Sequence, residues 1–134
     1  MQTLTAMEAL VLGSAAGGGL PQWNCGCAVC AAARTGAATP RTQSSLAIRA
    51  AGGPWYLVNA SPDVRQQLEL LRDGEIPLRS TPFAGVLLTD AEIDHTAGLV
   101  VLREGPGRLQ VHASAPIRTA LERGFALLLS LIHI

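Results

Sequence analysis

An apolar run at residues 84–88 that leads directly into an acidic loop constrains the fold of this chain more than any other feature. The run predicts a buried strand, and the residues after the loop, 95–102, predict a helix. Four side chains able to bind a metal ion or move a proton fall in the loop: Asp90, Glu92, Asp94 and His95. Three carboxylates at a strand end favour a bound cation, because desolvated carboxylates are unfavourable. Oxygen ligands with one imidazole suit a divalent metal ion, iron(II) included. A solvated acidic turn at a helix N-terminus explains the same residues about as well.

The cysteines form a second candidate site. All three lie in one short motif, at Cys25, Cys27 and Cys30. This spacing favours a structural zinc ion, although a closed zinc site needs a fourth ligand from elsewhere in the protein. A redox pair with one free thiol, or three buried inert thiols, are the alternatives, and the odd number of cysteines argues against a pure disulfide framework.

Composition limits the possible partners and location. A length of 134 residues allows one small domain or part of a larger one. The net charge is zero and the arginines form no run, so nucleic acid is not expected as the main partner. No signal peptide or membrane span is expected, which predicts a cytoplasmic location and favours metal over disulfide for the cysteines.

The order of elements is rich in strands at first and then alternates. Strands are expected at residues 8–12, 45–50, 55–59, 84–88 and 109–113, the second and third forming a hairpin. Ser61 and Ser114 are expected to begin helices, with apolar faces carrying Val64, Leu68 and Leu71, and Ile117, Leu121 and Phe125. Residues 13–19 form a glycine-rich loop that is either a flexible turn or a close approach to a ligand or strand.

The last residues have an unusual origin in our interpretation. Residues 129–134 can be encoded by CTG TCT CTT ATA CAC ATC, which is the end of a transposase adaptor used in sequencing libraries. We therefore expect native sequence over residues 1–128 and a tail derived from the adaptor over 129–134, with no role for His133. A genuine apolar terminal helix is the alternative.

Long motifs resemble the pyrroloquinoline quinone (PQQ) biosynthesis protein B family. They lie at residues 11–19, 21–25, 40–45, 59–67 and from the acidic loop through 102–105. The resemblance covers about residues 8–125. It implies an α/β (α+β) fold, the first half of a metallo-β-lactamase-like αββα sandwich. Half a sandwich leaves an apolar face uncovered, so the chain alone is expected to aggregate and to be inactive.

The resemblance also bears on the ligands. The parent superfamily has His-x-His-x-Asp-His after this strand and binds two metal ions there. Asp90 and Glu92 stand at the two histidine positions, whereas Asp94 and His95 match. Such a change favours a harder cation or a single metal over two-zinc hydrolysis, which is kept as a distant third function. The cysteine loop is similar to the structural zinc loop of related phosphodiesterases, whose fourth ligand is a C-terminal histidine.

Two functions are implied for the family, which makes PQQ from a Glu- and Tyr-containing precursor. One is an iron-dependent hydroxylase of a tyrosine ring, in which Asp94, His95 and Asp90 would hold iron(II) and Glu92 would be a ligand, a base or a partner of a ligand. The other is a carrier without catalysis. The partner of a carrier would be PQQ or its precursor, and since PQQ is a tricarboxylate, Arg41, Arg65 or Arg103 would contact it.

Overall fold

A computed structural model describes residues 6–72, 74, 77–124 and 132–133. Within them, one six-stranded mixed sheet has its strands in sequence order. The strands are β1 (Met7–Gly13), β2 (Ser45–Ala50), β3 (Tyr56–Val58), β4 (Gly85–Leu87), β5 (Leu109–His112) and β6 (Ile132–His133). The β1, β2 and β3 strands are antiparallel, and β3 to β6 are parallel. The five strands expected from the sequence, and the hairpin, are therefore confirmed.

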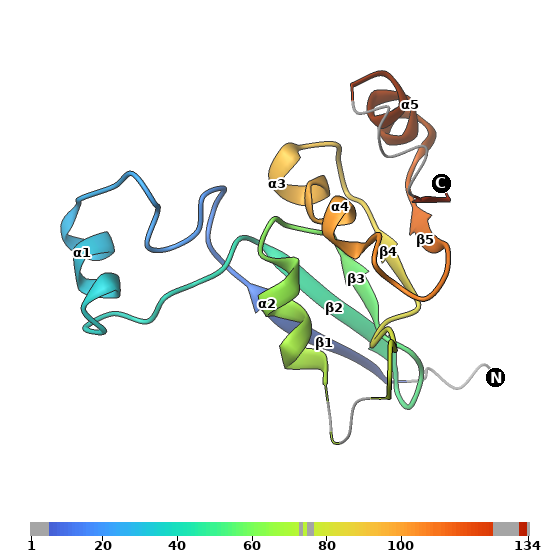
Figure 1. The fold of residues 1–134 in the computed structure, drawn as a ribbon, viewed down its shortest axis with the longest axis horizontal. Coiled ribbons are helices and arrows are strands. Elements are labelled where there is room, and N and C mark those ends of the chain that lie inside the picture. The colour runs from blue at the N-terminus through green and yellow to red at the C-terminus, as the bar shows by residue number, and fades with distance from the viewer. Residues whose placement is uncertain (1–5, 73, 75–76, 125–131, 134) are drawn as a thin grey trace.

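Short helices accompany the sheet (Figure 1). They are α1 (Ala28–Arg34), α2 (Val64–Leu68), the 3-10 helix η1 (Glu69–Leu71), α3 (Ile93–Thr96), α4 (Gly98–Leu102) and α5 (Ala115–Gly124). The α2 and α4 helices lie side by side, and α2 also contacts β1. The α1 helix stands away from the sheet, at the end of the cysteine loop (Figure 1).

The two faces of the sheet differ in burial. On one face, the strand residues Leu12, Leu57 and Val86 pack in a core with Val64 and Leu99 from the helices. This apolar packing is the main stabilising contribution to the fold.

The opposite face is apolar as well but remains open. Side chains alternate between the two faces along a strand. Met7, Val11 and Leu46 are accordingly 73%, 60% and 37% exposed, and Val11 pairs with Leu46 across β1 and β2. The described residues thus form a sheet with helices on one side, as expected for the first half of a sandwich.

Two local expectations were wrong in detail. The second helix begins at Val64, not near Ser61, and its N-cap residue Asp63 makes no capping hydrogen bond. The helix expected over residues 95–102 is divided into α3 and α4. At the division, the Gly98 N–H donates to the carbonyl of Ala60 at 2.9 Å, and a Cβ on Gly98 would overlap the carbonyl oxygen of Ser61. This tertiary contact overrides the local helical preference.

The chain's last residues lie mostly outside the described part. Ile132–His133, within the proposed adaptor tail, pair with β5 as β6, while residues 125–131 and 134, Phe125 included, are outside the described residues. The origin of residues 129–134 stays a prediction. No helix in the described part is long and apolar enough to cross a membrane.

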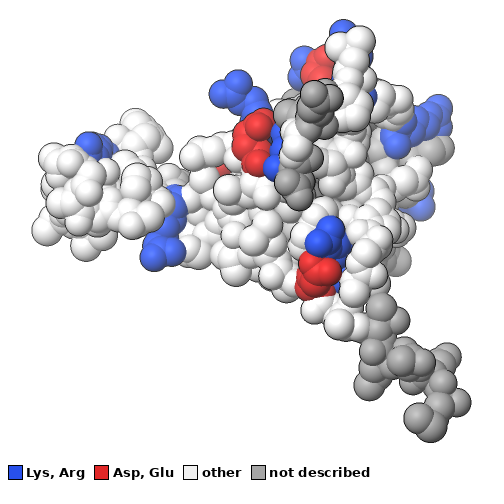
Figure 2. Space-filling model, turned by 90° about the horizontal axis from the view of Figure 1, so that it is seen from below, with Lys and Arg blue, Asp and Glu red and all other residues white. Residues whose placement is uncertain are grey.

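Charge is spread over the surface. Figure 2 shows, on the face it presents, arginine side chains separated by wide areas of uncharged surface. This pattern agrees with the arginines being scattered along the sequence.

Candidate functional site

The acidic loop leaves the carboxyl end of β4 and is fixed to the loop after β3. The Asn59 Nδ2 donates to Thr89 Oγ1 at 2.9 Å, and the Thr89 N–H donates to Asn59 Oδ1 at 3.0 Å. Asn59 has a left-handed backbone, with φ of 65°, which asparagine tolerates better than most residues. The start of the loop is therefore held before its acidic residues are placed.

Asp90 and His95 form a close pair within the loop. Both carboxylate oxygens of Asp90 lie 2.8 Å from His95 Nδ1. An ionised carboxylate can only accept, so Nδ1 carries the proton and the unprotonated nitrogen of a neutral ring is Nε2. A carboxylate behind the imidazole is the usual arrangement of a metal-binding histidine.

Further hydrogen bonds hold Asp90 ionised. The Glu92 N–H donates to Asp90 Oδ1 and the Thr89 hydroxyl to Oδ2, each at 2.9 Å. Partial burial by itself raises the pKa of Asp90, but the hydrogen bonds from Glu92, His95 and Thr89 outweigh it, so the pKa of Asp90 lies below its usual value. The Asp90 carboxylate is thus engaged with His95 and the loop backbone, and its role as a metal ligand stays a prediction.

Asp94 faces the glycine-rich loop. A Cβ added to Gly17 would lie 3.0 Å from Asp94 Oδ2, so the backbone at Gly17 passes directly against this carboxylate. Residues 13–19 thus make a close backbone approach, but to the Asp94 side chain instead of to the ligand or strand that was one of the two alternatives. Glu92 is exposed, and its side chain has no recorded partner among the described residues.

A buried polar network positions the glycine-rich loop. The Gly18 N–H donates to Gln43 Oε1 at 3.2 Å. Gln43 donates in turn to Asp63 Oδ2 from its backbone N–H at 2.9 Å and from Nε2 at 3.2 Å. Gln43 and Asp63 were not identified as functional from the sequence; the only indication was that both fall in motifs that carry the family resemblance.

Gln67 lies at the centre of this network and is fully buried. Its Nε2 donates to the Gln43 carbonyl at 2.7 Å and to Thr42 Oγ1 at 3.0 Å, and its Oε1 accepts from the Ser61 hydroxyl at 3.0 Å. A Cβ on Gly13 would overlap the Gln43 carbonyl oxygen and crowd Gln67, so this position requires glycine.

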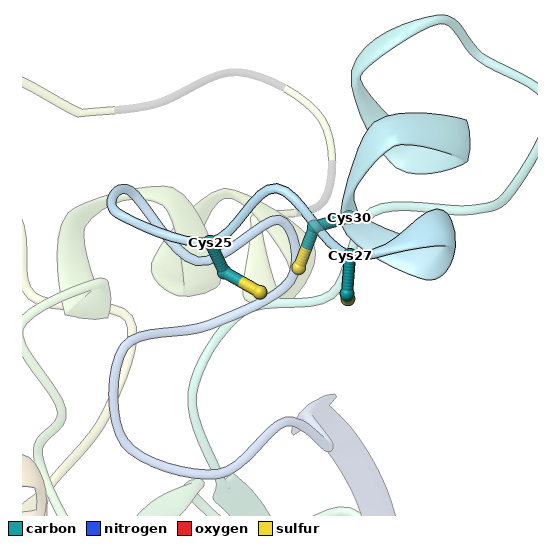
Figure 3. A group of neighbouring side chains, drawn as sticks. All are labelled: Cys25, Cys27 and Cys30. Carbon is teal, nitrogen blue, oxygen red and sulfur yellow. The ribbon is translucent and has the colours of Figure 1, made fainter.

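The cysteines are the predicted ligands that the structure brings together. Ligand atoms of Cys25, Cys27 and Cys30 all lie within 4.8 Å of one another, the only such group of three in the part of the chain that the structure describes. They come from one loop and the first turn of α1 (Figure 3). Asp90 and His95 meet, but Asp94 does not join them within that distance, so an acidic-loop metal site stays a prediction.

The cysteine loop is closed by Arg34 at the end of α1. Its guanidinium donates to the carbonyls of Cys25 at 2.5 Å and Gln22 at 2.6 Å.

Hydrogen bonds from the Cys30 backbone and from the Cys25 and Cys30 thiols lower the pKa of Cys27 to about 7. All three cysteines are free thiols and Cys27 is exposed, which disagrees with three buried inert thiols. Thiolates at this spacing suit zinc, with three ligands present among the described residues.

Comparisons with known proteins decide the family. A family model described as "Beta-lactamase superfamily domain" matches residues 54–133, more than half of the chain. The chain belongs to the β-lactamase superfamily. Among curated members, Coenzyme PQQ synthesis protein B of Methylobacterium nodulans is 56% identical over 83% of this chain and 38% of the relative. The protein of that name from Stutzerimonas stutzeri is 48% identical over 95% of this chain and 43% of the relative.

Two solved structures have a similar fold. Zn²⁺-bound PqqB from Methylobacterium extorquens superposes with a TM-score of 0.77 at 44% identity, covering 88% of this chain and 40% of that one. A diphosphatase from the PhnP family gives 0.71 at 22% identity, covering 96% and 50%, and this likeness concerns the fold alone.

The resemblance to PQQ biosynthesis protein B and the α/β class with a β-lactamase-like fold are thereby confirmed. This superfamily chain spans 38–43% of the length of the two curated relatives. The zinc-bound relative and the cysteine cluster together support metal binding.

Proposed function

We propose that the full-length protein containing this chain acts in PQQ biosynthesis and that this chain carries part of its metal centre. The support is the identity of 56% to a Coenzyme PQQ synthesis protein B. We place the step in the cytoplasm, where reducing conditions keep Cys25, Cys27 and Cys30 available for structural zinc.

The reaction we propose is the hydroxylation of a tyrosine ring in a Glu- and Tyr-containing precursor. One atom of dioxygen enters the ring, and two electrons from an added reductant take the other atom to water. Iron(II), when bound, supplies the redox chemistry of this oxidation. A donor set of one imidazole with carboxylates suits such a divalent ion.

The observation that carries the proposal is the pairing of Asp90 with His95 at 2.8 Å. Asp90 orients the imidazole and leaves Nε2 as the ligand atom, so Asp90 is a positioning residue here. His95 and Asp94 would hold the metal, with the Gly17 backbone limiting where the Asp94 carboxylate can lie. The exposed Glu92 carboxylate would accept a proton from the substrate.

A carrier for PQQ or its precursor is the second candidate, and the placement of the arginines bears on it. Arg65 lines a cavity of about 480 Å³ beside α2. Arg41 instead donates to Ser14 Oγ at 3.1 Å, and Arg103 pairs with Glu104 at 3.1 Å. Of the three arginines, Arg65 best fits a carboxylate ligand.

Two assays test the proposal in the full-length protein. A strain that lacks the gene should regain PQQ production from the complete reading frame; no recovery would contradict a role in the pathway. Iron-loaded protein with ascorbate should then consume oxygen and add one oxygen atom to a Glu-Tyr substrate. The His95→Ala variant should do neither while keeping its fold. If the wild type consumes no oxygen and PQQ binding survives His95→Ala, the carrier function replaces the hydroxylase.

A further inference from the structure

A cavity of about 480 Å³ lies at the end of the sheet opposite the acidic loop. Ala84, just before β4, and Leu109, the first residue of β5, are part of its wall. The acidic loop follows the other end of β4, so the cavity and the candidate metal site are separated by the length of this strand. Its volume falls in the range of about 300–1,000 Å³ that is usual for small-molecule sites.

The walls of the cavity are largely apolar. They are formed by α2, η1 and α4 together with the segments before β4 and β5, and the apolar side chains are Leu68, Phe83, Val101, Leu102 and Leu109. Val101 is 43% exposed. A ligand would therefore find an apolar surface on which a flat ring can pack.

Positive charge is concentrated on the same lining. Arg65 and Arg72 contribute guanidinium groups, and the carboxylates of the lining are Glu69, which lies 3.7 Å from Arg72, and Glu104. Glu104 is already paired with Arg103 at 3.1 Å, outside this lining. Arg65 has no recorded hydrogen bond or ion pair among the described residues. The lining thus presents an excess of positive charge.

Arg72 lines this cavity and is held only loosely by its neighbours. Its Nε is buried without a hydrogen-bond partner, and Glu69 Oε1 lies 3.7 Å from it, an ion-pair contact beyond hydrogen-bonding distance. The Arg72 side chain is 23% exposed, so the accessible part of its guanidinium is the pair of terminal nitrogens. These nitrogens are the donors that a ligand carboxylate would meet.

We propose that this cavity binds a small organic acid whose carboxylate is carried on an aromatic ring. The carboxylate accepts from Arg72 and Arg65, and the ring packs on Phe83 and Leu102. Guanidinium groups match a carboxylate in geometry as well as charge. The site requires no metal ion and is distinct from the acidic loop.

The test is calorimetric titration of the full-length protein with 2-naphthoate, an aromatic carboxylate. The neutral 2-naphthylmethanol is the matched ligand without the charge. We expect saturable binding of naphthoate, at least ten-fold weaker binding of the alcohol, and a loss of about ten-fold in affinity in Arg72→Gln and in Arg65→Gln. Arg123→Gln removes the same charge from an exposed position of α5, outside the cavity, and should bind like the wild type.

Three results would overturn the proposal: no saturable binding, equal binding of acid and alcohol, or wild-type affinity in both cavity variants. Since Arg65 is exposed, its replacement should leave the fold intact even if Arg72→Gln destabilises it.

PQQ, itself an aromatic tricarboxylate, is a second probe, and only this arm rests on the proposed function. If PQQ binding depends on Arg65 and Arg72, the cavity serves the pathway. If the binding of naphthoate depends on Arg65 and Arg72 but the binding of PQQ does not, the site takes another aromatic acid. The proposed role in PQQ biosynthesis is then unaffected.

Discussion

Replacing Gln67 by leucine should lower the free energy of unfolding more than any other conservative change in the buried polar network that positions the glycine-rich loop. Leucine nearly preserves the volume of the side chain but removes its amide. The change breaks the hydrogen bonds to Thr42, Gln43 and Ser61, which measure 3.0, 2.7 and 3.0 Å. Because Gln67 is fully buried, water cannot replace the lost partners.

The size of the effect follows from these contacts. Three hydrogen bonds at about 1 kcal/mol each give a loss of about 3 kcal/mol in the free energy of unfolding, and the buried groups left without partners can add to it. Small domains are stable by only about 5–15 kcal/mol, so the loss is a large part of the total.

Urea unfolding of the full-length protein measures this difference from the transition midpoint and slope. The neighbouring Gln66→Leu variant is the control, because Gln66 is exposed and its change should stay within about 0.5 kcal/mol. Equal stability of the two variants would refute the view that the Gln67 network supports the fold.

Three further predictions concern the cysteines and the open face of the sheet. In metal-free protein, the rate at which iodoacetamide alkylates Cys27 should rise with pH through a midpoint near 7, because the thiolate reacts and its pKa is lowered to about 7; a midpoint near 9 would contradict the hydrogen bonding of the loop. Cys27→Ser should lower the zinc content of the full-length protein, and unchanged zinc would rule out the cysteine site. The 134-residue chain expressed alone should aggregate, because Met7 and Val11 leave an apolar face open; a monodisperse monomer with a sharp melt in light scattering and calorimetry would count against this.

The features predicted correctly from the sequence are those that depend on neighbouring residues. The strand β4 follows from an apolar run, and the cysteine cluster from spacing within one loop. The division between α3 and α4 could not be predicted, since it depends on Gly98 meeting Ala60 from a distant segment.

The site shows the same limit. The four chemical groups of the acidic loop allowed either a shared metal site or a solvated turn, and the metal site stays a prediction. Three-dimensional packing pairs Asp90 with His95 and places Asp94 against Gly17. Likewise, the Gln43–Asp63 contact joins residues 20 positions apart and has no local pattern. Spacing identified which groups are present but not how they are paired.

The most direct test of the account is iron(II) binding by the acidic loop, measured in full-length protein that carries Cys27→Ser so that the cysteine site does not contribute. The Asp90–His95 geometry predicts that the full-length Cys27→Ser protein binds iron(II). Adding Asp90→Asn to it should weaken iron(II) binding about 10–100-fold, and adding His95→Ala should remove most of the binding. Iron(II) affinity unchanged by His95→Ala would contradict the assignment of His95 as a metal ligand, and with it the proposed hydroxylase.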